Sequence, residues 1–421
     1  MSRPPGQPRI VVIGGGVASA TAVTALRAEG FAGRITLVSA ENTVPYERPP
    51  LSKEFLRGAS LGGDPDVPDA AWYPEQEIDL RLGVRATRLD LAARTVGLSD
   101  GAVIGYDQLL LATGVRPRVL PGLEADGVCY LRTVADAAAL RDRIGAAGHV
   151  AVLGGGFIGC EVAASVIQLG KRATILEALP TLLHRALGSE LGEAVAGIHR
   201  DQGVDVRTGQ VVTGVRPRPG GGVRIGTADG GVDADVLVVG VGTVPNTELA
   251  ADAGLTADGG IHVDEYFATS APGVYAIGDV AAQYLPAYRR RVRVEHHDTA
   301  IRHGRAVARN MAGRPEPFGD VHWFWSDQYD HSLQSAGLPG GTDDLIIRGS
   351  PARRSFSAFR LDGGRVHAVI ALNRPKDVLQ VRRLIGRDHH VTAEQLQDES
   401  APLKRLAASR PVTTITRTEG A

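Results

Sequence analysis

The chain has 421 residues, of which 43% are hydrophobic, and a formal net charge of -1. This length predicts two to three domains of about 150 residues, and the composition excludes a wholly disordered chain and a globally basic nucleic-acid-binding protein. The two cysteines, Cys129 and Cys160, exclude a disulfide scaffold, a four-cysteine metal site and a Cys-x-x-Cys redox pair within this chain.

The first apolar segment, Ile10 to Leu26, follows two arginines and is rich in small residues, as a secretory signal is. The alternative is a buried strand, a glycine turn and a helix. Gly14-Gly15-Gly16 would interrupt the helical core that a signal needs, so the sequence favours the strand, turn and helix. No other stretch has the roughly 20 uncharged apolar residues of a membrane span. We therefore expect no membrane partner and a cytoplasmic location.

An internal repeat follows from the same segment. Residues 10–19 (IVVIGGGVAS) recur as residues 150–159 (VAVLGGGFIG), and a second apolar strand follows each copy, at 35–38 and 173–176. Each copy predicts a β-α-β unit whose glycine turn lets a pyrophosphate approach a helix N-terminus. The fingerprint glycines are Gly14 and Gly16 in the first copy, where Ser19 takes the third position, and Gly154, Gly156 and Gly159 in the second. Two dinucleotide sites are therefore expected.

The end of the second strand of each unit bears on the choice of nucleotide. A carboxylate there accepts hydrogen bonds from an adenosine ribose and repels a 2′-phosphate. Glu177, 18 residues after Gly159, therefore predicts NADH, unless it is only a solvated strand-end charge; Arg172 and Arg185 are the cations that could instead favour NADPH. In the first copy Ser39 and Ala40 occupy the strand end and Glu41 follows, which leaves the ribose contact open.

Further elements complete the predicted architecture. Apolar strands that run into glycine loops are expected at 109–114 and 236–240, a helix at 134–144, and a hairpin between 211–215 and 223–225. After about residue 320 strand-like stretches, including 355–361 and 366–372, alternate with helices, and the last dozen residues predict a loose tail. We expect an α/β fold with two Rossmann-like dinucleotide-binding domains and a C-terminal α+β domain.

Several longer segments carry a resemblance to a known family. They are Pro45 to Lys53 (PYERPPLSK), Ala112-Thr113-Gly114, Tyr130 to Thr133, Gly242 to Asn246, Thr269 to Asp279 (TSAPGVYAIGD) and Phe324 to Asp330 (FWSDQYD). Together with the two glycine fingerprints they resemble the FAD-dependent and NADH-dependent ferredoxin reductases of the putidaredoxin reductase type, within the two-dinucleotide-binding flavoprotein superfamily. The resemblance covers the chain to about residue 400. It implies an FAD-binding domain of residues 1–115 and 246–320, an NADH-binding domain of 116–245 and a C-terminal α+β domain of 321–421.

The resemblance also implies three catalytic residues. Lys53 would lie near the redox-active edge of the flavin, where a cation stabilises the charge that builds on reduction. Glu161 would lie near the nicotinamide. Trp325 would stack near the flavin on a route towards a partner, although a lone tryptophan is as often part of a core.

The remaining residues that the resemblance implies are cofactor-binding residues. Ala86 is expected after a strand at 82–84, and Asp279 is expected at a helix N-terminus on the ribityl chain, where its alternative role is that of an N-cap. The full set for FAD is Gly14, Gly16, Ala18, Glu41, Arg48, Lys53, Ala86, Arg132, Asp279 and His297; the set for NADH is Gly154, Gly156, Ile158, Gly159, Glu177 and Gly242.

Two charged features allow more than one interpretation. Val294 to Asp298 (VEHHD) resembles the apoptosis-inducing-factor branch of the superfamily, and its His296-His297 pair could suggest a metal; neighbours on a strand face opposite sides, however, so no metal is expected. Arginines at 289–291, 293, 302, 305 and 309 could form a solvated face, steer an acidic ferredoxin or bind nucleic acid. Aromatic residues are not interleaved with them, so nucleic-acid binding is not expected.

The predicted function is that of a ferredoxin reductase. A hydride would pass from NADH onto FAD, and single electrons would then pass to an acidic [2Fe–2S] ferredoxin that supplies a cytochrome P450 or another oxygenase. Without a Cys-x-x-Cys pair, no internal dithiol can relay the electrons. Two alternatives stay open, a rubredoxin reductase and a redox-sensing flavoprotein like the apoptosis-inducing factor.

Overall fold

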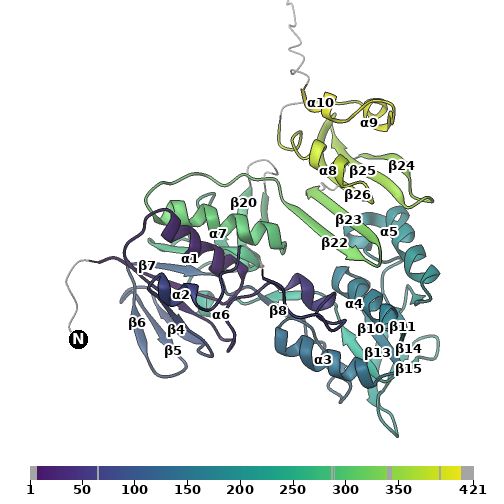
Figure 1. Ribbon diagram of the computed structural model, residues 1–421, viewed down its shortest axis with the longest axis horizontal. Coiled ribbons are helices and arrows are strands. Elements are labelled where there is room, and N and C mark those ends of the chain that lie inside the picture. Colours follow the sequence, from purple (N-terminus) through teal and green to yellow (C-terminus); the bar gives the residue numbers. More distant parts are fainter. Residues whose placement is uncertain are drawn as a thin grey trace, which may run out of the picture. The chain divides into compact units, whose positions relative to one another are not determined.

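The computed structural model describes residues 7–63, 66–285, 288, 290–338, 344–387 and 390–408 (Figure 1). The chain divides into two compact units, Met1–Asp320 and Val321–Ala421. Each unit is described by itself below. The tail expected over the last dozen residues lies outside the described part of the chain.

A five-stranded parallel sheet forms the first half of the larger unit. Its order is β19-β7-β1-β2-β3, so β1 is the central strand. Ile10, Val11 and Val12 are fully buried there, and α1 begins directly after the glycine turn. The strand, turn and helix expected for this segment are therefore confirmed. The elements are β1 (Arg9–Ile13), α1 (Val17–Ala28), β2 (Arg34–Val38), β3 (Ile78–Arg81), β7 (Gln108–Leu111) and β19 (Val274–Ala276).

A second parallel sheet repeats this arrangement. Its order is β12-β11-β10-β16-β9, and β10 occupies the centre as β1 does in the first sheet. The helix α3 starts with a capping box, in which Thr133 and Asp136 each bond the other's backbone N–H. The elements are β9 (Val128–Cys129), α3 (Val134–Ala146), β10 (His149–Leu153), α4 (Phe157–Gln168), β11 (Arg172–Leu176), α5 (His184–Asp201), β12 (Asp205–Arg207) and β16 (Val236–Val239).

Smaller elements surround the two sheets. The hairpin expected after residue 211 is present as β13 and β14. Three-stranded sheets are formed by β4 (Ala86–Asp90), β5 (Thr95–Leu98) and β6 (Val103–Gly105), by β13 (Val212–Pro217), β14 (Val223–Thr227) and β15 (Val232–Ala234), and by β18 (Ile261–Val263), β20 (Ala281–Leu285) and β21 (Arg290–Arg293). The remaining elements are α2 (Trp72–Glu75), α6 (Glu248–Asp252), α7 (His297–Met311) and the short 3₁₀ helices η1 (Pro49–Ser52) and η2 (Gly278–Val280).

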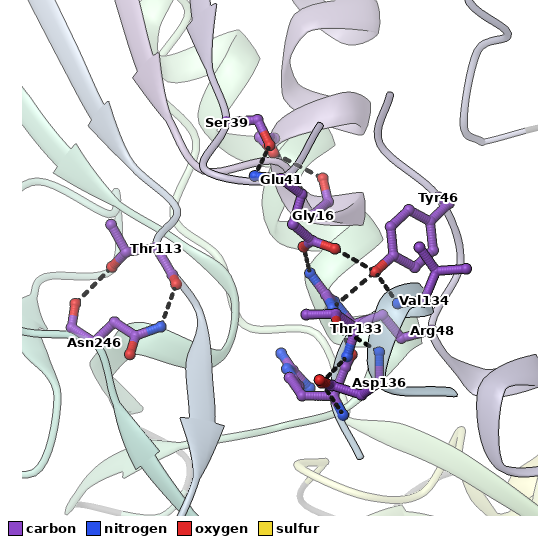
Figure 2. A network of polar contacts seen from close by, with 12 residues as sticks. Gly16, Ser39, Glu41, Tyr46, Arg48, Thr113, Thr133, Val134, Asp136 and Asn246 are labelled. Carbon is purple, nitrogen blue, oxygen red and sulfur yellow. Dashed lines mark hydrogen bonds and ion pairs between the residues drawn. The ribbon is translucent and has the colours of Figure 1, made fainter. Parts of the chain in front are cut away.

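The chain passes twice between the two parallel sheets, and the two passages are paired. The strands β8 (Val115–Pro117) and β17 (Thr243–Pro245) run antiparallel. Beside them, the Thr113 hydroxyl donates to the Asn246 carbonyl at 2.7 Å, and the Asn246 amide donates to the Thr113 carbonyl at 2.8 Å (Figure 2). The passages lie at the positions where the predicted FAD-binding and NADH-binding domains meet; those domain bounds stay a prediction.

The smaller unit contains an antiparallel sheet with helices packed on it. The sheet order is β22-β23-β26-β25-β24, and Phe359, Val369 and Leu396 are fully buried in its core. The buried Arg348 donates to the carbonyl groups of Leu396, Asp398 and Ala401 and so fixes the segment after α9. The elements are β22 (Trp323–Gln328), β23 (His331–Gly337), β24 (Asp344–Ser350), β25 (Ser355–Asp362), β26 (Arg365–Leu372), α8 (Pro375–Val381), α9 (Ala393–Gln397) and α10 (Lys404–Ala408). The expected fold class, with two Rossmann-like domains and a C-terminal α+β domain, is confirmed.

Two local expectations are wrong. The strand expected at 82–84 is a turn, because β3 ends at Arg81 and Gly83 has a φ of +68°, which only glycine adopts readily. The pair His296-His297 does not lie on a strand, because β21 ends at Arg293 and His296 is the N-cap of α7. The argument that the two rings face opposite sides therefore does not apply.

In the described residues no group of three or more His, Cys, Asp and Glu side chains is placed to hold a metal ion. No helix among them has the length and apolarity to cross a membrane.

Close packing of α1 against α7 predicts a stability effect (Figure 1). A Cβ at Gly304 of α7 would lie 2.7 Å from the Ala18 carbonyl oxygen and 2.9 Å from the Ala22 nitrogen. We expect Gly304→Ala to lower the free energy of unfolding by about 1–3 kcal/mol, because the helices must separate. Chemical unfolding of the protein measures the change.

The matched control is Gly145→Ala in α3, where a Cβ meets no atom within 4 Å. This change should leave the free energy of unfolding unaltered or raise it by up to about 1 kcal/mol, since alanine is the better helix former. Equal effects of the two substitutions would contradict the packing argument.

Candidate functional site

The two glycine turns lie at the carboxyl ends of the central strands β1 and β10. A Cβ at Gly14 would lie 2.0 Å from the Ala112 carbonyl oxygen, and one at Gly154 would lie 2.4 Å from that of Gly240. Both glycines also have positive φ, +131° and +106°. Each turn therefore packs backbone against backbone at the end of the neighbouring strand, which only glycine permits.

The second glycine of each turn is different, because the fold does not require it. Gly16 and Gly156 are the N-caps of α1 and α4, and neither makes a side-chain cap hydrogen bond. A Cβ at either position would meet no atom within 4 Å. Each helix N-terminus therefore opens onto free space, where its unpaired N–H groups can bind a pyrophosphate. The residues present fit one dinucleotide at each turn.

The third position differs between the copies. Ser19 is buried and its hydroxyl donates to the Gly16 carbonyl at 2.7 Å. At Gly159 a Cβ would lie 2.0 Å from the Gly154 carbonyl oxygen. The first turn therefore has room for a serine and the second has not. Ala18, in the first turn of α1, is buried, whereas Ile158, at the corresponding place in α4, is 45% exposed.

Glu177 lies where the sequence places it, just beyond the end of β11. Its two carboxylate oxygens accept the N–H groups of Gly155, at 2.6 Å, and Leu179, at 2.8 Å. The side chain therefore holds the glycine turn to the strand end. Arg172 begins β11 and is about 16 Å along the strand from Glu177, at roughly 3.3 Å per residue, so it cannot contribute to the same site. Arg185, in the first turn of α5, is the remaining cation of the two.

The counterpart in the first copy, Glu41, belongs to a hydrogen-bonded network (Figure 2). Its carboxylate accepts hydrogen bonds from the Arg48 guanidinium at 2.6 Å and from the Tyr46 hydroxyl at 2.5 Å. Tyr46 in turn accepts the N–H of Val134 at 2.8 Å, and Arg48 donates to the carbonyl of Arg132 at 2.6 Å. The network ties the loop after β2 to the start of α3.

Burial and charge act together in this network. Burial raises the pKa of the Tyr46 phenol, and the hydrogen bond to Glu41 adds to the rise. Burial lowers the pKa of Arg48, but the neighbouring Tyr46 and Glu41 outweigh it, and the net shift is upward. At neutral pH the tyrosine is therefore neutral and donates, while the arginine is charged.

The other residues expected around the flavin lie as follows. Asp279 is not at the start of a long helix but inside the three-residue η2, where its carboxylate accepts the Arg132 guanidinium at 2.9 Å. The His297 ring nitrogen Nε2 lies 3.0 Å from a Glu47 carboxylate oxygen. Ala86 begins β4, and Gly242 follows β16 with a φ of +104°. Their contacts with a cofactor stay predictions.

Lys53 and Glu161 form a buried ion pair in the larger unit. Their nitrogen and oxygen are 3.3 Å apart, and the residues are 7% and 4% exposed. Lys53 directly follows η1, whereas Glu161 lies in α4. The structure thus brings together two of the three residues expected to be catalytic. Trp325 lies in β22 of the smaller unit, stacked on Trp323 with ring centroids 5.1 Å apart; its predicted role stays a prediction.

Two serines at this ion pair were not among the predicted site residues. The Ser52 hydroxyl donates to Glu161 at 2.5 Å, and the Ser165 hydroxyl donates to the Ser52 carbonyl at 2.8 Å. A signal for Ser165 was available, because it follows Glu161 by four residues and so shares its helix face. Ser52 lies inside the PPLSK motif, directly before Lys53.

Both cysteines are free. Burial raises the pKa of the Cys160 thiol, and the charges of Glu161 and Glu177 raise it further. Cys129 is half-buried, and burial raises its pKa as well. Both side chains are therefore thiols at neutral pH, and neither can act as the nucleophile of a dithiol relay.

Carboxylates and carbonyl groups already bind most of the clustered arginines. Arg291 donates to backbone carbonyl groups of β18 and β20, and Arg293 donates to one of η2. Arg302 pairs with Asp298 and Asp320, Arg305 with Asp66, and Arg309 with Glu29 and Glu316. Arg289 lies outside the described residues. The positive charge that this cluster presents is therefore much smaller than its sequence indicates.

Comparison with known proteins agrees with this geometry. Residues 8–304 match the family described as pyridine nucleotide-disulphide oxidoreductase, and residues 323–407 match the reductase C-terminal family. The chain is 41% identical to the ferredoxin–NAD(+) reductase component of the anthranilate 1,2-dioxygenase system of Burkholderia cepacia, over 94% of this chain and 98% of that protein. It is 38% identical to putidaredoxin reductase of Pseudomonas putida, over 95% and 97%. In the crystal structure of the covalent putidaredoxin reductase–putidaredoxin complex, a chain with 37% identity superposes with a TM-score of 0.91, covering 95% of this chain and 98% of that one.

The fold and the two glycine turns define an oxidoreductase that uses FAD and NADH. More narrowly, the chain belongs to the pyridine nucleotide-disulphide oxidoreductase family and, within it, to the ferredoxin–NAD(+) reductases of the putidaredoxin reductase type.

The open space at Gly156 predicts a selective effect on NADH binding. We expect Gly156→Val to leave the fold intact, because a Cβ meets nothing there, and to weaken NADH binding by about tenfold or more, because the side chain occupies the pyrophosphate position. Flavin content, thermal unfolding and NADH titration measure the three properties. Gly197→Val in α5, where a Cβ also meets nothing, is the control. Undiminished NADH affinity in Gly156→Val would place the pyrophosphate elsewhere.

The position of Glu177 predicts nucleotide preference. We expect Glu177→Arg to weaken NADH use and to improve NADPH use, shifting the ratio of the two kcat/KM values by about tenfold or more, since arginine attracts a 2′-phosphate. Glu177→Gln separates this effect from the loss of the Gly155 anchor. The control is Glu75→Arg, which makes the same charge change on an exposed residue of α2. An unchanged ratio in Glu177→Arg would show that this side chain does not face the ribose.

Proposed function

We propose that this protein oxidises NADH and passes electrons one at a time to a [2Fe–2S] ferredoxin, which supplies a cytochrome P450 or another oxygenase. The observation that carries the proposal is the buried Lys53–Glu161 pair, which joins the segment after η1 to the helix of the second glycine turn in a chain without a dithiol. The relatives named above, a dioxygenase reductase component and putidaredoxin reductase, support it.

The two turns have separate roles in this proposal. The turn after β1, with Ala18, Arg132 and Asp279, binds FAD within residues 1–115 and 246–320. The turn after β10, with Ile158, Glu177 and Gly242, binds NADH within residues 116–245. The remaining residues proposed to contact FAD are Gly14, Gly16, Glu41, Arg48, Ala86 and His297. Because the glycine turns end central strands, both nucleotides would lie at the switch points of their sheets.

The side chains at the ion pair bind and orient the reactants. FAD, when bound, accepts two electrons as a hydride and gives them up singly. Lys53 presents its ammonium to the ring edge, where negative charge builds, and Glu161 fixes that ammonium from the side of α4. Burial of both groups keeps water away and strengthens their interaction. Trp325 is proposed to contact the flavin from the C-terminal unit.

The site of action proposed here is the cytoplasm, where NADH is available. An acidic ferredoxin is proposed as partner, docked by the surface around the flavin rather than by the α7 arginines, because carboxylates already pair with those arginines.

Anaerobic titration tests this function. We expect the purified protein to show flavin absorbance that NADH bleaches, with NADPH at least about tenfold less effective, and rapid turnover when a [2Fe–2S] ferredoxin and cytochrome c are added. A preparation without flavin, or one whose flavin NADH does not bleach, would contradict the proposal. Slow NADH oxidation that no iron–sulfur carrier accelerates would point instead to the redox-sensing alternative, and preference for rubredoxin in a panel of carriers would point to a rubredoxin reductase.

A further inference from the structure

A chain of hydrogen bonds reaches the Lys53–Glu161 pair from the protein surface. The Ser52 hydroxyl donates to Glu161 Oε2 at 2.5 Å, and Lys53 Nζ donates to the same oxygen at 3.3 Å. Ser52 is 2% exposed. The carboxylate oxygen nearest the ammonium is therefore also held by a buried neutral donor.

The next layer fixes Ser52 itself. Ser165, fully buried in α4, donates its hydroxyl to the Ser52 carbonyl at 2.8 Å. Its oxygen accepts the Arg57 guanidinium at 3.2 Å. One Arg57 N–H thus donates to Ser165, Ser165 donates to the Ser52 backbone, and the Ser52 side chain donates to Glu161.

The two segments that this chain joins are distant in sequence. Ser52, Lys53 and Arg57 belong to η1 and the turns after it, and backbone hydrogen bonds from Lys53 to Pro50 and from Arg57 to Lys53 hold that segment together. Glu161 and Ser165 are one turn apart on α4. The segment after η1 and the helix that starts at the second glycine turn are therefore held in register by side chains that face each other.

We propose that Ser52 is a positioning residue for the reaction of NADH with the flavin, and that Ser165 positions Ser52. The inference rests on the proposed function of the Lys53–Glu161 pair. A glutamate side chain has three rotatable bonds and a lysine has four, so a single ion-pair contact does not by itself fix the orientation of the carboxylate. The serine hydroxyl selects one carboxylate orientation, so the ammonium has a single position relative to the ring edge. A hydrogen bond to a charged group in a buried site is strong enough to favour one orientation of the Glu161 carboxylate over the others.

The experiment compares single-turnover flavin reduction by NADH in five variants under anaerobic conditions. We expect Ser52→Ala to slow the reduction by about tenfold, with the NADH dissociation constant within about threefold of the original, because orientation and not binding is lost. Ser52→Thr keeps a hydroxyl and should restore most of the rate. Ser165→Ala should have a smaller effect of the same kind. The double variant Ser52→Ala with Glu161→Gln should be no slower than Glu161→Gln alone, since the serine acts through the carboxylate.

The matched control is Ser357→Ala. Ser357 is also fully buried and donates to a carboxylate, that of Asp377, at 2.8 Å, but it lies in the C-terminal unit. Its loss should change thermal unfolding as much as the loss of Ser52 does, and should leave flavin reduction unchanged. A second readout, the long-wavelength absorbance of the complex between reduced flavin and NAD⁺, should weaken in Ser52→Ala and not in Ser357→Ala.

Each outcome has one meaning. A reduction rate in Ser52→Ala equal to that of Ser357→Ala would overturn the positioning role while leaving the proposed function in place. A double variant whose rate loss equals the product of the losses in Ser52→Ala and Glu161→Gln would overturn it too, because the serine would then act independently of the carboxylate. An unaltered rate in Glu161→Gln would instead contradict the proposed function of the ion pair, and the inference would fall with it.

Discussion

A buried ammonium and a buried carboxylate, Lys53 and Glu161, join the two nucleotide-binding halves of the larger unit, in addition to the paired strands β8 and β17. Withdrawing two charges from water is costly, and removing one partner from such a pair typically costs about 3–5 kcal/mol because the other charge stays buried alone. The pair is therefore tolerated only where further donors satisfy the carboxylate, as the hydroxyl of Ser52 does. Since Lys53 follows η1 and Glu161 lies in α4, neither half can shift against the other without separating these charges. The contact that fixes this geometry is also the one to which we assign the chemistry.

The two copies of the β-α-β unit share the conformation of the glycine turn but differ in the contacts of the glutamate that follows the second strand. Gly14 and Gly154 have the same close approach to a neighbouring strand end, which the fold itself requires. The carboxylates that follow differ. Glu177 bonds its own glycine turn, whereas Arg48 and Tyr46 bind Glu41 and connect it to the start of α3. Glu177 therefore holds its glycine turn within its own half of the larger unit, whereas Glu41 joins the loop after β2 to the other half.

The sequence predicted the fold class, both glycine turns and the strands that carry them, because buried parallel strands are short apolar runs and the turns need glycine. It did not predict the turn at Gly83 or the helical start at His297. Leu82 and Val84 are apolar but flank a glycine of positive φ, and the extended His296 is an N-cap rather than part of a strand. The partners of charged and polar side chains were the hardest property to predict from the sequence. The arginines of α7 resemble a basic patch in the sequence because two of their partners, Asp66 and Glu29, lie more than 200 residues away in the chain. Ser52 and Ser165 each stand close in sequence to a predicted site residue, but only the fold brings the two serines together.

The raised pKa values of Cys129 and Cys160 have a chemical consequence of their own. Peroxide oxidises the thiolate, and a thiol that stays protonated reacts slowly. A reduced flavin that meets oxygen produces peroxide close to its own protein. In this chain one cysteine lies directly before Glu161, yet it is fully buried and protonated. The packing around α4 therefore keeps the Cys160 thiol out of the reactions of this by-product.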